Sequence, residues 1–265
     1  MLREILGVLV LATISTPAQW LHYPTAGIPR TRDGKPNLTA PAPKARDRKP
    51  DLSGLWLPDN DPAVKGTNGE SLPKPLIDIT RALKAGELVM QPWAEALMAE
   101  RSRNFQADDP ITACKPVGGP RLNYIPAPIK IVQNPGLILL LHEQEVTFRQ
   151  IHTDGRKLPE DPQPSTFGYS IARWEGNVLV VDTIGFHDQG WLDFVGHPYS
   201  DVLRVTERFH RRDFGHLEVQ IRIDDPKAYK NPFSVTQTMT FLADTDLLEY
   251  QCSENERDVR HFVVK

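Results

Sequence analysis

Apolar and polar side chains alternate along the chain between Lys130 and Cys252, in runs that each end at turn residues. In the clearest run, Leu217, Val219 and Ile221 fall on one side of an extended chain, and the charged and amide side chains between them fall on the other. A two-residue period is typical of a β-strand with one buried face. Because tight turns join strands in antiparallel order, this half of the chain is predicted to form one continuous antiparallel meander.

The expected strands are numerous enough to curl into a closed wall. Turn signals such as Pro135 with Gly136 and Gly176 with Asn177 separate them. Closure removes exposed strand edges, so a mainly β fold with a β-barrel is the leading prediction and a two-sheet β-sandwich is the alternative. The expected strands are 51–57, 130–133, 137–143, 146–152, 168–175, 178–186, 203–211, 215–224, 233–242 and 247–252.

One clear helix is expected before the meander. Apolar side chains recur at helical spacing between Gln91 and Phe105, and Pro92 suits the first turn. We expect the apolar stripe of this helix to pack against the sheet, and a second helix over 75–84. The chain has 265 residues and 40% hydrophobic residues, which fits a single β-barrel domain spanning 50–265.

The N-terminus has the pattern of a secretory signal peptide, covering residues 1–18. An apolar run from Ile5 to Ser15 follows Arg3 and is followed by small residues suited to cleavage. The run is shorter than the roughly 20 residues that span a bilayer, which disfavours the alternative of a membrane anchor. The mature chain is therefore expected to be secreted or periplasmic, with no membrane span. Residues 19–49 are rich in proline and are expected to form an extended or disordered lead, with packing over the domain as one alternative.

Export bears on the two cysteines, Cys114 and Cys252. An oxidising compartment allows such a pair to form a disulfide, which would tie the segment before the meander to its last expected strand. Two separate thiols are the alternative. A structural zinc site is not indicated, because the cysteines lack the CxxC spacing.

Charge and motifs exclude several function classes. A net charge of -3 provides no field to attract a polyanion, so nucleic-acid binding is not expected. The sequence has no P-loop, no GxGxxG that opens a helix and no GxSxG elbow. We therefore expect no cofactor, and the sequence leaves the oligomeric state open.

Two expected strands carry a polar residue on an otherwise apolar face. Glu207 shares its face with Val205 and Phe209, and Gln237 shares its face with Val235. A carboxylate among apolar neighbours must find a partner or take up a proton. Glu207 is therefore the first candidate for a catalytic acid in a cavity, and Gln237 is a candidate ligand contact.

Two further charged residues are expected near the same interior. Glu143 is the last residue of the expected strand 137–143 and falls on the same side as Leu137, Leu139 and Leu141. This indicates a carboxylate at the mouth of the barrel. Arg149 could pair with either glutamate or hold a ligand carboxylate. The alternatives are a solvated strand end for Glu143, and a structural salt bridge between Glu207 and either Arg149 or Arg204.

The connection from His187 to Ser200 is unusually long for two neighbouring strands. Loops of this kind commonly line a binding site on the rim of a rigid scaffold. Its carboxylates and imidazoles could bind a divalent metal or form an acid–base pair, but their spacing matches no metal-binding motif, so no metal site is predicted. His197 is the candidate for proton transfer. The candidate ligand contacts here are His187, Asp188, Trp191, Asp193 and Tyr199.

Gly54, Leu55 and Trp56 resemble the GxW opening of lipocalin and calycin barrels, in which the Trp closes one end of the barrel. Trp56 as an ordinary core aromatic is the alternative. A wider set of motifs resembles a widespread family of exported, largely uncharacterised bacterial proteins, which implies export and a β fold but no particular activity. These motifs are PDLSGLW (50–56), CKPVGGPR (114–121), DGRKLP (154–159), RWEGNVLVVDT (173–183), GHPYSDVLRVTERF (196–209) and DDPKAY (224–229).

These features together predict an exported calycin-like barrel that binds a small, partly apolar organic molecule. The bolder expectation is acid–base chemistry of hydratase, lyase or isomerase type, with Glu207 or His197 moving the proton and Arg149 stabilising negative charge. The alternatives are a ligand-binding protein without catalysis, and a structural cell-envelope protein whose charges form only salt bridges.

Overall fold

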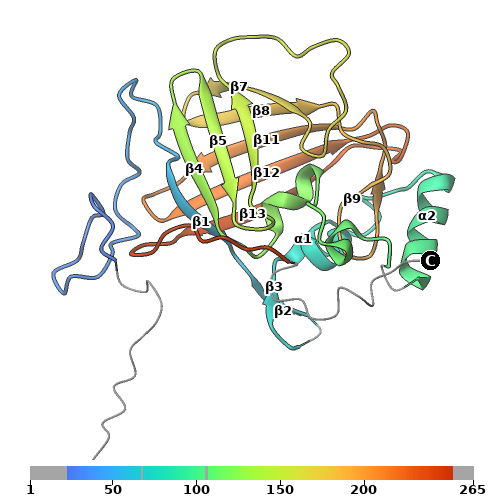
Figure 1. Ribbon diagram of the computed structural model, residues 1–265, viewed down its shortest axis with the longest axis horizontal. Coiled ribbons are helices and arrows are strands. Elements are labelled where there is room, and N and C mark those ends of the chain that lie inside the picture. The colour runs from blue at the N-terminus through green and yellow to red at the C-terminus, as the bar shows by residue number, and fades with distance from the viewer. Residues whose placement is uncertain (1–22, 67, 105–106, 253–265) are drawn as a thin grey trace, which may run out of the picture.

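The computed structural model of the protein describes residues 23–66, 68–104 and 107–252, so the predicted signal peptide lies outside the described residues. Over these ranges, nine strands close into one barrel (Figure 1), which confirms the barrel over the sandwich. The barrel strands are β1 (Gly54–Pro58), β4 (Ile129–Asn134), β5 (Leu137–His142), β6 (Thr147–His152), β7 (Tyr169–Glu175), β8 (Val178–Ile184), β11 (Arg204–Arg211), β12 (His216–Asp224) and β13 (Phe233–Phe241).

The barrel closes because β1 pairs with β13 on one side and with β4 on the other. Neighbouring barrel strands are antiparallel except β6 and β7, which run parallel through two pairs, Ile151 with Ser170 and His152 with Ile171. The prediction of one continuous antiparallel meander is therefore wrong at this point. Residues 153–168 return the chain from one end of the barrel to the other, the long connection that a parallel pair requires.

The alternating pattern predicted most strand boundaries to within two residues, but the last expected strand, 247–252, is wrong. The described residues there form only an isolated bridge between Tyr250 and Gln144. Since β1 already fills the place between β13 and β4, the barrel has no free edge for another strand. The side chain of Leu248 is accordingly 54% exposed.

One end of the barrel, which we call the lead end, lies beside the Pro-rich N-terminal segment. Trp56 is fully buried at this end, and the guanidinium of Arg211 lies over its ring at 4.8 Å. Gly54 is needed beside it, because its φ is +140° and an added Cβ would lie 2.3 Å from the ring of Phe241. Arg211 also donates to the backbone carbonyl of Asp51, which ties the lead to the barrel.

The opposite end, which we call the plugged end, is closed by the 3-10 helix η3 (Gly119–Tyr124), whose six residues are all buried. The hydroxyl of Tyr124 donates to the carbonyl of Leu192, which holds the long 187–200 loop against η3. That loop contains a small hairpin of β9 (Gly190–Trp191) and β10 (Pro198–Tyr199). The shorter elements before β4 are β2 (Asp61–Lys65), β3 (Ser71–Leu72), α1 (Lys74–Ile77), η1 (Ile79–Ala82) and η2 (Pro110–Ala113).

The helices differ from expectation in detail. The expected helix over 75–84 is instead the two short elements α1 and η1, while α2 (Pro92–Arg103) confirms the helix expected over 91–105. Its main partner is β10 and not the barrel sheet, and it buries Ala94 and Arg101 while Trp93 stays exposed. The residues that line the plugged end are thus placed by α2, η3 and the 187–200 loop.

Candidate functional site

Two of the inward-facing charges of the barrel, Arg149 and Glu207, form one buried ion pair. Both terminal nitrogens of Arg149 donate to the carboxylate of Glu207, which also accepts from the side-chain amide of Asn123 at 2.6 Å. Arg149 further donates to Ser170 at 3.1 Å and to Thr183 at 2.8 Å. Of the alternatives raised by the sequence, the partner of Glu207 is therefore Arg149 and not Arg204.

This pair is sealed from solvent. The side chain of Glu207 is 1% exposed and that of Arg149 is 7% exposed. A buried carboxylate with a charged partner and a further amide donor has its hydrogen-bonding needs met within the protein. The arrangement therefore favours a structural role for Glu207 over a role as an acid in an open cavity.

His142 is a further polar side chain on the inner face. Its Nε2 is buried and has no hydrogen-bond partner among the residues that the structure describes. Burial, assisted by the positive charge of Arg149, lowers the pKa of His142 to about 3, so the imidazole is neutral at physiological pH.

Glu143 is not inside the barrel. The buried residues of β5 are Ile138, Leu140 and His142, so the predicted phase is inverted. β5 is apolar on both faces, and alternation therefore cannot say which face is inward. The carboxylate of Glu143 accepts from the backbone N–H of Leu248 at 3.2 Å, away from Glu207.

His197 also lies apart from the Arg149–Glu207 pair. Its Nδ1 is 2.6 Å from the carboxylate of Asp193, which also accepts from the backbone N–H groups of Ile79, Gly196 and His197 itself. Burial opposes the charged imidazole, but the hydrogen bond and charge of Asp193 outweigh it and raise the pKa of His197. The predicted proton-transfer group is thus part of a buried clamp that fixes the loop to η1.

Asp78, Asp193 and His197 place potential metal-ligand atoms within 4.8 Å of one another. Both carboxylates already accept hydrogen bonds from the backbone. Asp78 accepts from the N–H of Thr80, and Asp193 accepts from three backbone N–H groups. These contacts account for the cluster as a hydrogen-bonded junction between η1 and the loop.

A cavity of about 430 Å³, which we call the plug pocket, lies at the plugged end. It is built from the end of α2, the chain between η2 and η3, and the 187–200 loop. Four of the candidate ligand contacts from the loop line it, namely His187, Asp188, Trp191 and Tyr199. Asp193 and Gln237 do not line it, and Gln237 instead donates to the backbone carbonyls of Asp59 and Thr238.

Tyr199 is one of the polar residues that line the plug pocket. The residue is 3% exposed, and within the described chain its hydroxyl has no hydrogen-bond partner. Burial raises the pKa of Tyr199 well above its usual value, against the opposing charges of Arg121 and Arg101, so the phenol keeps its proton. Gly190 leaves the space that this ring occupies, because an added Cβ there would lie 1.8 Å from a ring carbon of Tyr199.

Two arginines that the sequence did not single out complete the plug pocket. Arg121 is fully buried and donates from both terminal nitrogens to Asp109 at 2.8 Å, and its buried Nε has no partner within the described ranges of the chain. Arg101 donates to the carbonyls of Gln189, Gly190 and Gly196 and lies 4.3 Å over the ring of Trp191. In the sequence, Arg121 is marked only as the last residue of the motif CKPVGGPR (114–121). Nothing in the sequence marks Arg101, in the expected helix, as a pocket residue.

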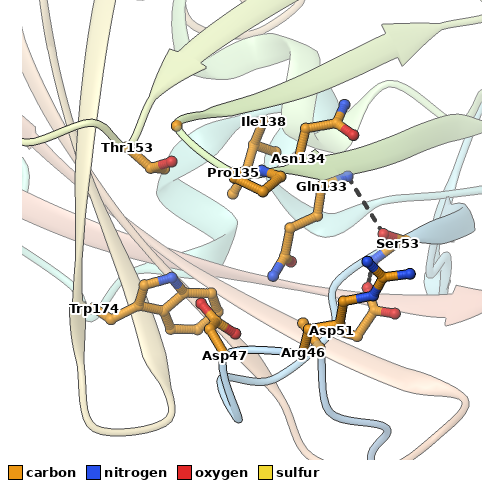
Figure 2. Close-up of a pocket in the computed structure, with 12 residues that line it drawn as sticks. Arg46, Asp47, Asp51, Ser53, Gln133, Asn134, Pro135, Ile138, Thr153 and Trp174 are labelled. Carbon is orange, nitrogen blue, oxygen red and sulfur yellow. Dashed lines mark hydrogen bonds between the residues drawn. The ribbon is translucent and has the colours of Figure 1, made fainter.

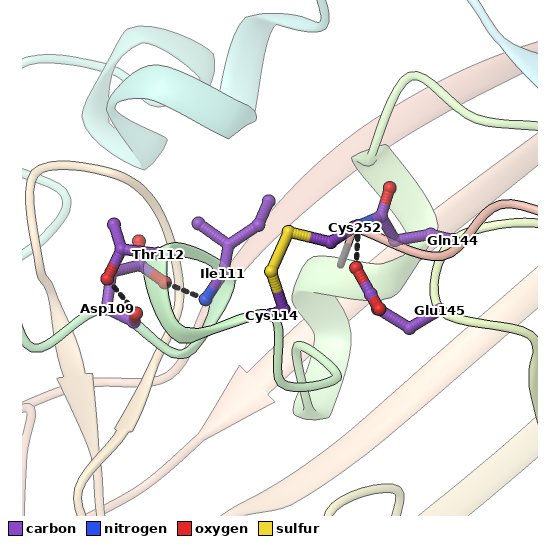
Figure 3. Close-up of a disulfide and its surroundings, with 7 residues drawn as sticks. All are labelled: Asp109, Ile111, Thr112, Cys114, Gln144, Glu145 and Cys252. Carbon is purple, nitrogen blue, oxygen red and sulfur yellow. Dashed lines mark hydrogen bonds between the residues drawn. A yellow bond between two sulfur atoms is a disulfide. The ribbon is translucent and has the colours of Figure 1, made fainter. Parts of the chain in front are cut away.

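The predicted disulfide is present and supports one wall of this pocket. Cys114 and Cys252 are bonded, with their Cα atoms 5.4 Å apart (Figure 3). Cys114 directly follows η2, and the next four residues, 115–118, line the plug pocket. The bridge therefore fastens the pocket wall to the chain beside Gln144 and Glu145 at the β5–β6 turn (Figure 3).

Comparisons with protein-family models, curated proteins and solved structures found no match. Among the described helices, none has the length and apolar character needed to cross a membrane.

Proposed function

We propose that this protein is an exported small-molecule-binding barrel and that the plug pocket takes a small organic acid. The single observation that carries the proposal is the free hydroxyl of Tyr199 in an otherwise buried residue at the pocket. This hydroxyl is not among the buried atoms without a partner, so it is reachable from the pocket, where a ligand oxygen can accept its hydrogen bond in place of water.

The available donors favour an oxygen-bearing, negatively charged ligand. The hydroxyl of Tyr199 can donate, the cation Arg101 bonds only to backbone carbonyls in the described chain, and Lys115 adds a positive charge at the exposed rim. The acids of the pocket, Asp108 and Asp188, are already hydrogen-bonded to Asn104 and to the backbone of Gln189. A carboxylate is the simplest group that accepts from several such donors at once.

The size and lining of the pocket suit an organic body attached to that carboxylate. Its volume of about 430 Å³ falls within the range of small-molecule sites. Apolar surface comes from Trp191, Val117 and the two prolines Pro110 and Pro116. Export is supported by the disulfide, which is typical of oxidising compartments.

Binding without catalysis is the form of the function that the geometry favours. Glu207 and Arg149 satisfy each other and do not line the plug pocket, and His197 is held by Asp193. The predicted acid–base groups are therefore not gathered around one bound molecule.

Calorimetric titration with benzoate, alongside uncharged benzyl alcohol, tests this function. We expect benzoate to bind more tightly than benzyl alcohol, and Tyr199→Phe to weaken benzoate binding about 10-fold or more, since hydrogen bonds to charged groups contribute roughly 1.5–3 kcal/mol. Tyr169→Phe is the matched control, because that hydroxyl accepts from Arg156 and lies outside the plug pocket. Equal binding of the two probes, or an unchanged affinity in Tyr199→Phe, would refute the proposal and leave the structural envelope protein as the better hypothesis.

A further inference from the structure

A second cavity, of about 650 Å³, lies at the lead end and has no part in the function proposed above. We call it the lead pocket. Figure 2 shows that its walls come from the β4–β5 turn, the residue after β6, one residue of β7 and the N-terminal lead. Its lining includes Arg46, Asp47, Gln133, Asn134, Thr153 and Trp174.

The wall contributed by the lead is fixed in place. The amide of Gln133 accepts from the N–H of Leu52 at 2.9 Å and donates to the carbonyl of Pro50 at 3.2 Å. Asp51 also accepts from the N–H of Ser53 at 2.8 Å. The lead pocket is therefore a built cavity, held by contacts between segments about 80 residues apart in the chain.

Trp174 supplies the only aromatic surface among the lining residues. It is half-buried, and in the described part of the chain its indole N–H has no hydrogen-bond partner. Figure 2 shows the indole along one side of the pocket, beside Asp47 and across from Gln133. One edge of the indole can thus donate a hydrogen bond while its ring offers an apolar surface.

The remaining lining is polar and mixed in character. Asn134, Thr153 and Arg46 have no side-chain partner among the described residues, and Asp47 uses one carboxylate oxygen on the N–H of Lys49. Amide, hydroxyl, guanidinium and carboxylate groups together offer both donors and acceptors. With one arginine and two aspartates in the lining, the pocket does not favour an anion.

We propose that the lead pocket binds a neutral sugar. A pyranose ring has an apolar C–H face, which can pack on the indole of Trp174, and an edge of hydroxyl groups, each both donor and acceptor. Those hydroxyl groups match the mixed polar rim around Asn134, Thr153 and Asp47. A purely apolar molecule would leave these groups without partners, so it fits less well.

Ligand-detected NMR on the protein tests this, with maltose and cellobiose as sugar probes. Cyclohexanol serves as the apolar probe and tetramethylammonium as the cationic probe. We expect at least one disaccharide to bind more tightly than either other probe, Trp174→Ala to weaken it at least 10-fold, and Asn134→Ala to weaken it several-fold. Trp93→Phe is the matched control, because Trp93 is exposed on α2 and its N–H donates to the carbonyl of Lys227.

Trp174 also packs against the core. Trp174→Phe is therefore measured too, because phenylalanine keeps an aromatic ring at this position and removes the indole N–H. If Trp174→Ala does not fold, Asn134→Ala and Trp174→Phe must still weaken sugar binding. Absence of sugar binding, a preference for cyclohexanol or tetramethylammonium, or sugar binding unchanged in all three variants would overturn the proposal. Tyr199→Phe leaves sugar binding intact, which separates this result from failure of the plug pocket.

Discussion

At the scale of single residues, Glu207 stands at a position where an unpaired charge would be most costly. Its carboxylate accepts from two nitrogens of Arg149 and from Asn123, and the pair lies inside an apolar barrel. The pair as a whole need not add stability, because desolvation offsets its attraction. Removing one partner is different, since it leaves the other charge buried alone.

We therefore expect Glu207→Gln to lower the free energy of unfolding by about 3–5 kcal/mol, measured by urea denaturation. The double variant Arg149→Met with Glu207→Leu should be more stable than Glu207→Gln, because no buried charge remains. Glu175→Gln, which breaks an exposed pair with Arg208 and Arg173, is the control and should give no measurable change. A Glu207→Gln protein as stable as the parent would mean that the pair is open to water.

His142 predicts a specific sensitivity to acid. Its pKa falls from an ordinary value of 6.5 to about 3 in the folded state, so between these values the unfolded chain binds the extra proton. The contribution of neutral His142 to stability is present above pH 6.5 and is lost as the pH falls, with a slope of up to about 1.4 kcal/mol per pH unit. His142→Leu should flatten the dependence of unfolding free energy on pH between 6.5 and 3, and an unchanged slope would show that His142 protonates in the folded state.

At the scale of elements, the sequence predicts strands well where one face is buried and poorly where both are. β12 alternates strictly, and its inward face was predicted residue by residue. β5 is apolar on both faces from Leu137 to Leu141. Its pattern therefore could not predict that His142 points inward and Glu143 outward. The parallel pairing of β6 with β7 depends on the 153–168 connection and not on the strands themselves.

The candidate site was predictable in part for a similar reason. The length and composition of the 187–200 loop indicated a binding rim, and four of its residues do line one pocket. Arg101 and Arg121 reach that pocket from distant segments through contacts with Gly190 and Asp109. Periodicity reports which face of one element is buried, and it carries no information on which distant side chain meets it.

The disulfide links an element to the site, and its reduction should affect both stability and binding. We expect reductant to lower the free energy of unfolding by about 2–4 kcal/mol, measured as a drop in melting temperature. Benzoate affinity should fall in parallel, because residues 115–118 directly follow Cys114 in the pocket wall. The double variant Cys114→Ser with Cys252→Ser should behave like the reduced protein and should not respond to reductant. Unchanged benzoate affinity in that variant would show that the wall is held by other contacts.

At the scale of the whole molecule, the barrel separates two cavities with different chemistry. The plugged end holds the hydroxyl of Tyr199 and the cations Arg101 and Lys115, whereas the lead end holds an indole among mixed polar groups. The barrel between them is filled by an apolar cluster that includes Ile151, Leu179 and Ile221, together with the buried Arg149–Glu207 pair. A closely packed core of this kind resists small deformations, so a ligand at one end has no evident means of altering the other.

This arrangement predicts two independent sites. The affinity for benzoate should be the same with and without saturating disaccharide, with a coupling free energy below about 0.5 kcal/mol, since distant sites that share no partners act additively. The measurement is a benzoate titration repeated in the presence of the sugar, with the double variant Tyr199→Phe and Trp174→Phe compared with each single variant. A coupling of 1 kcal/mol or more would require the barrel to have two packing arrangements. In that case the buried Arg149–Glu207 pair, which joins β6 to β11 beside the η3 residue Asn123, would be the first place to look for the change.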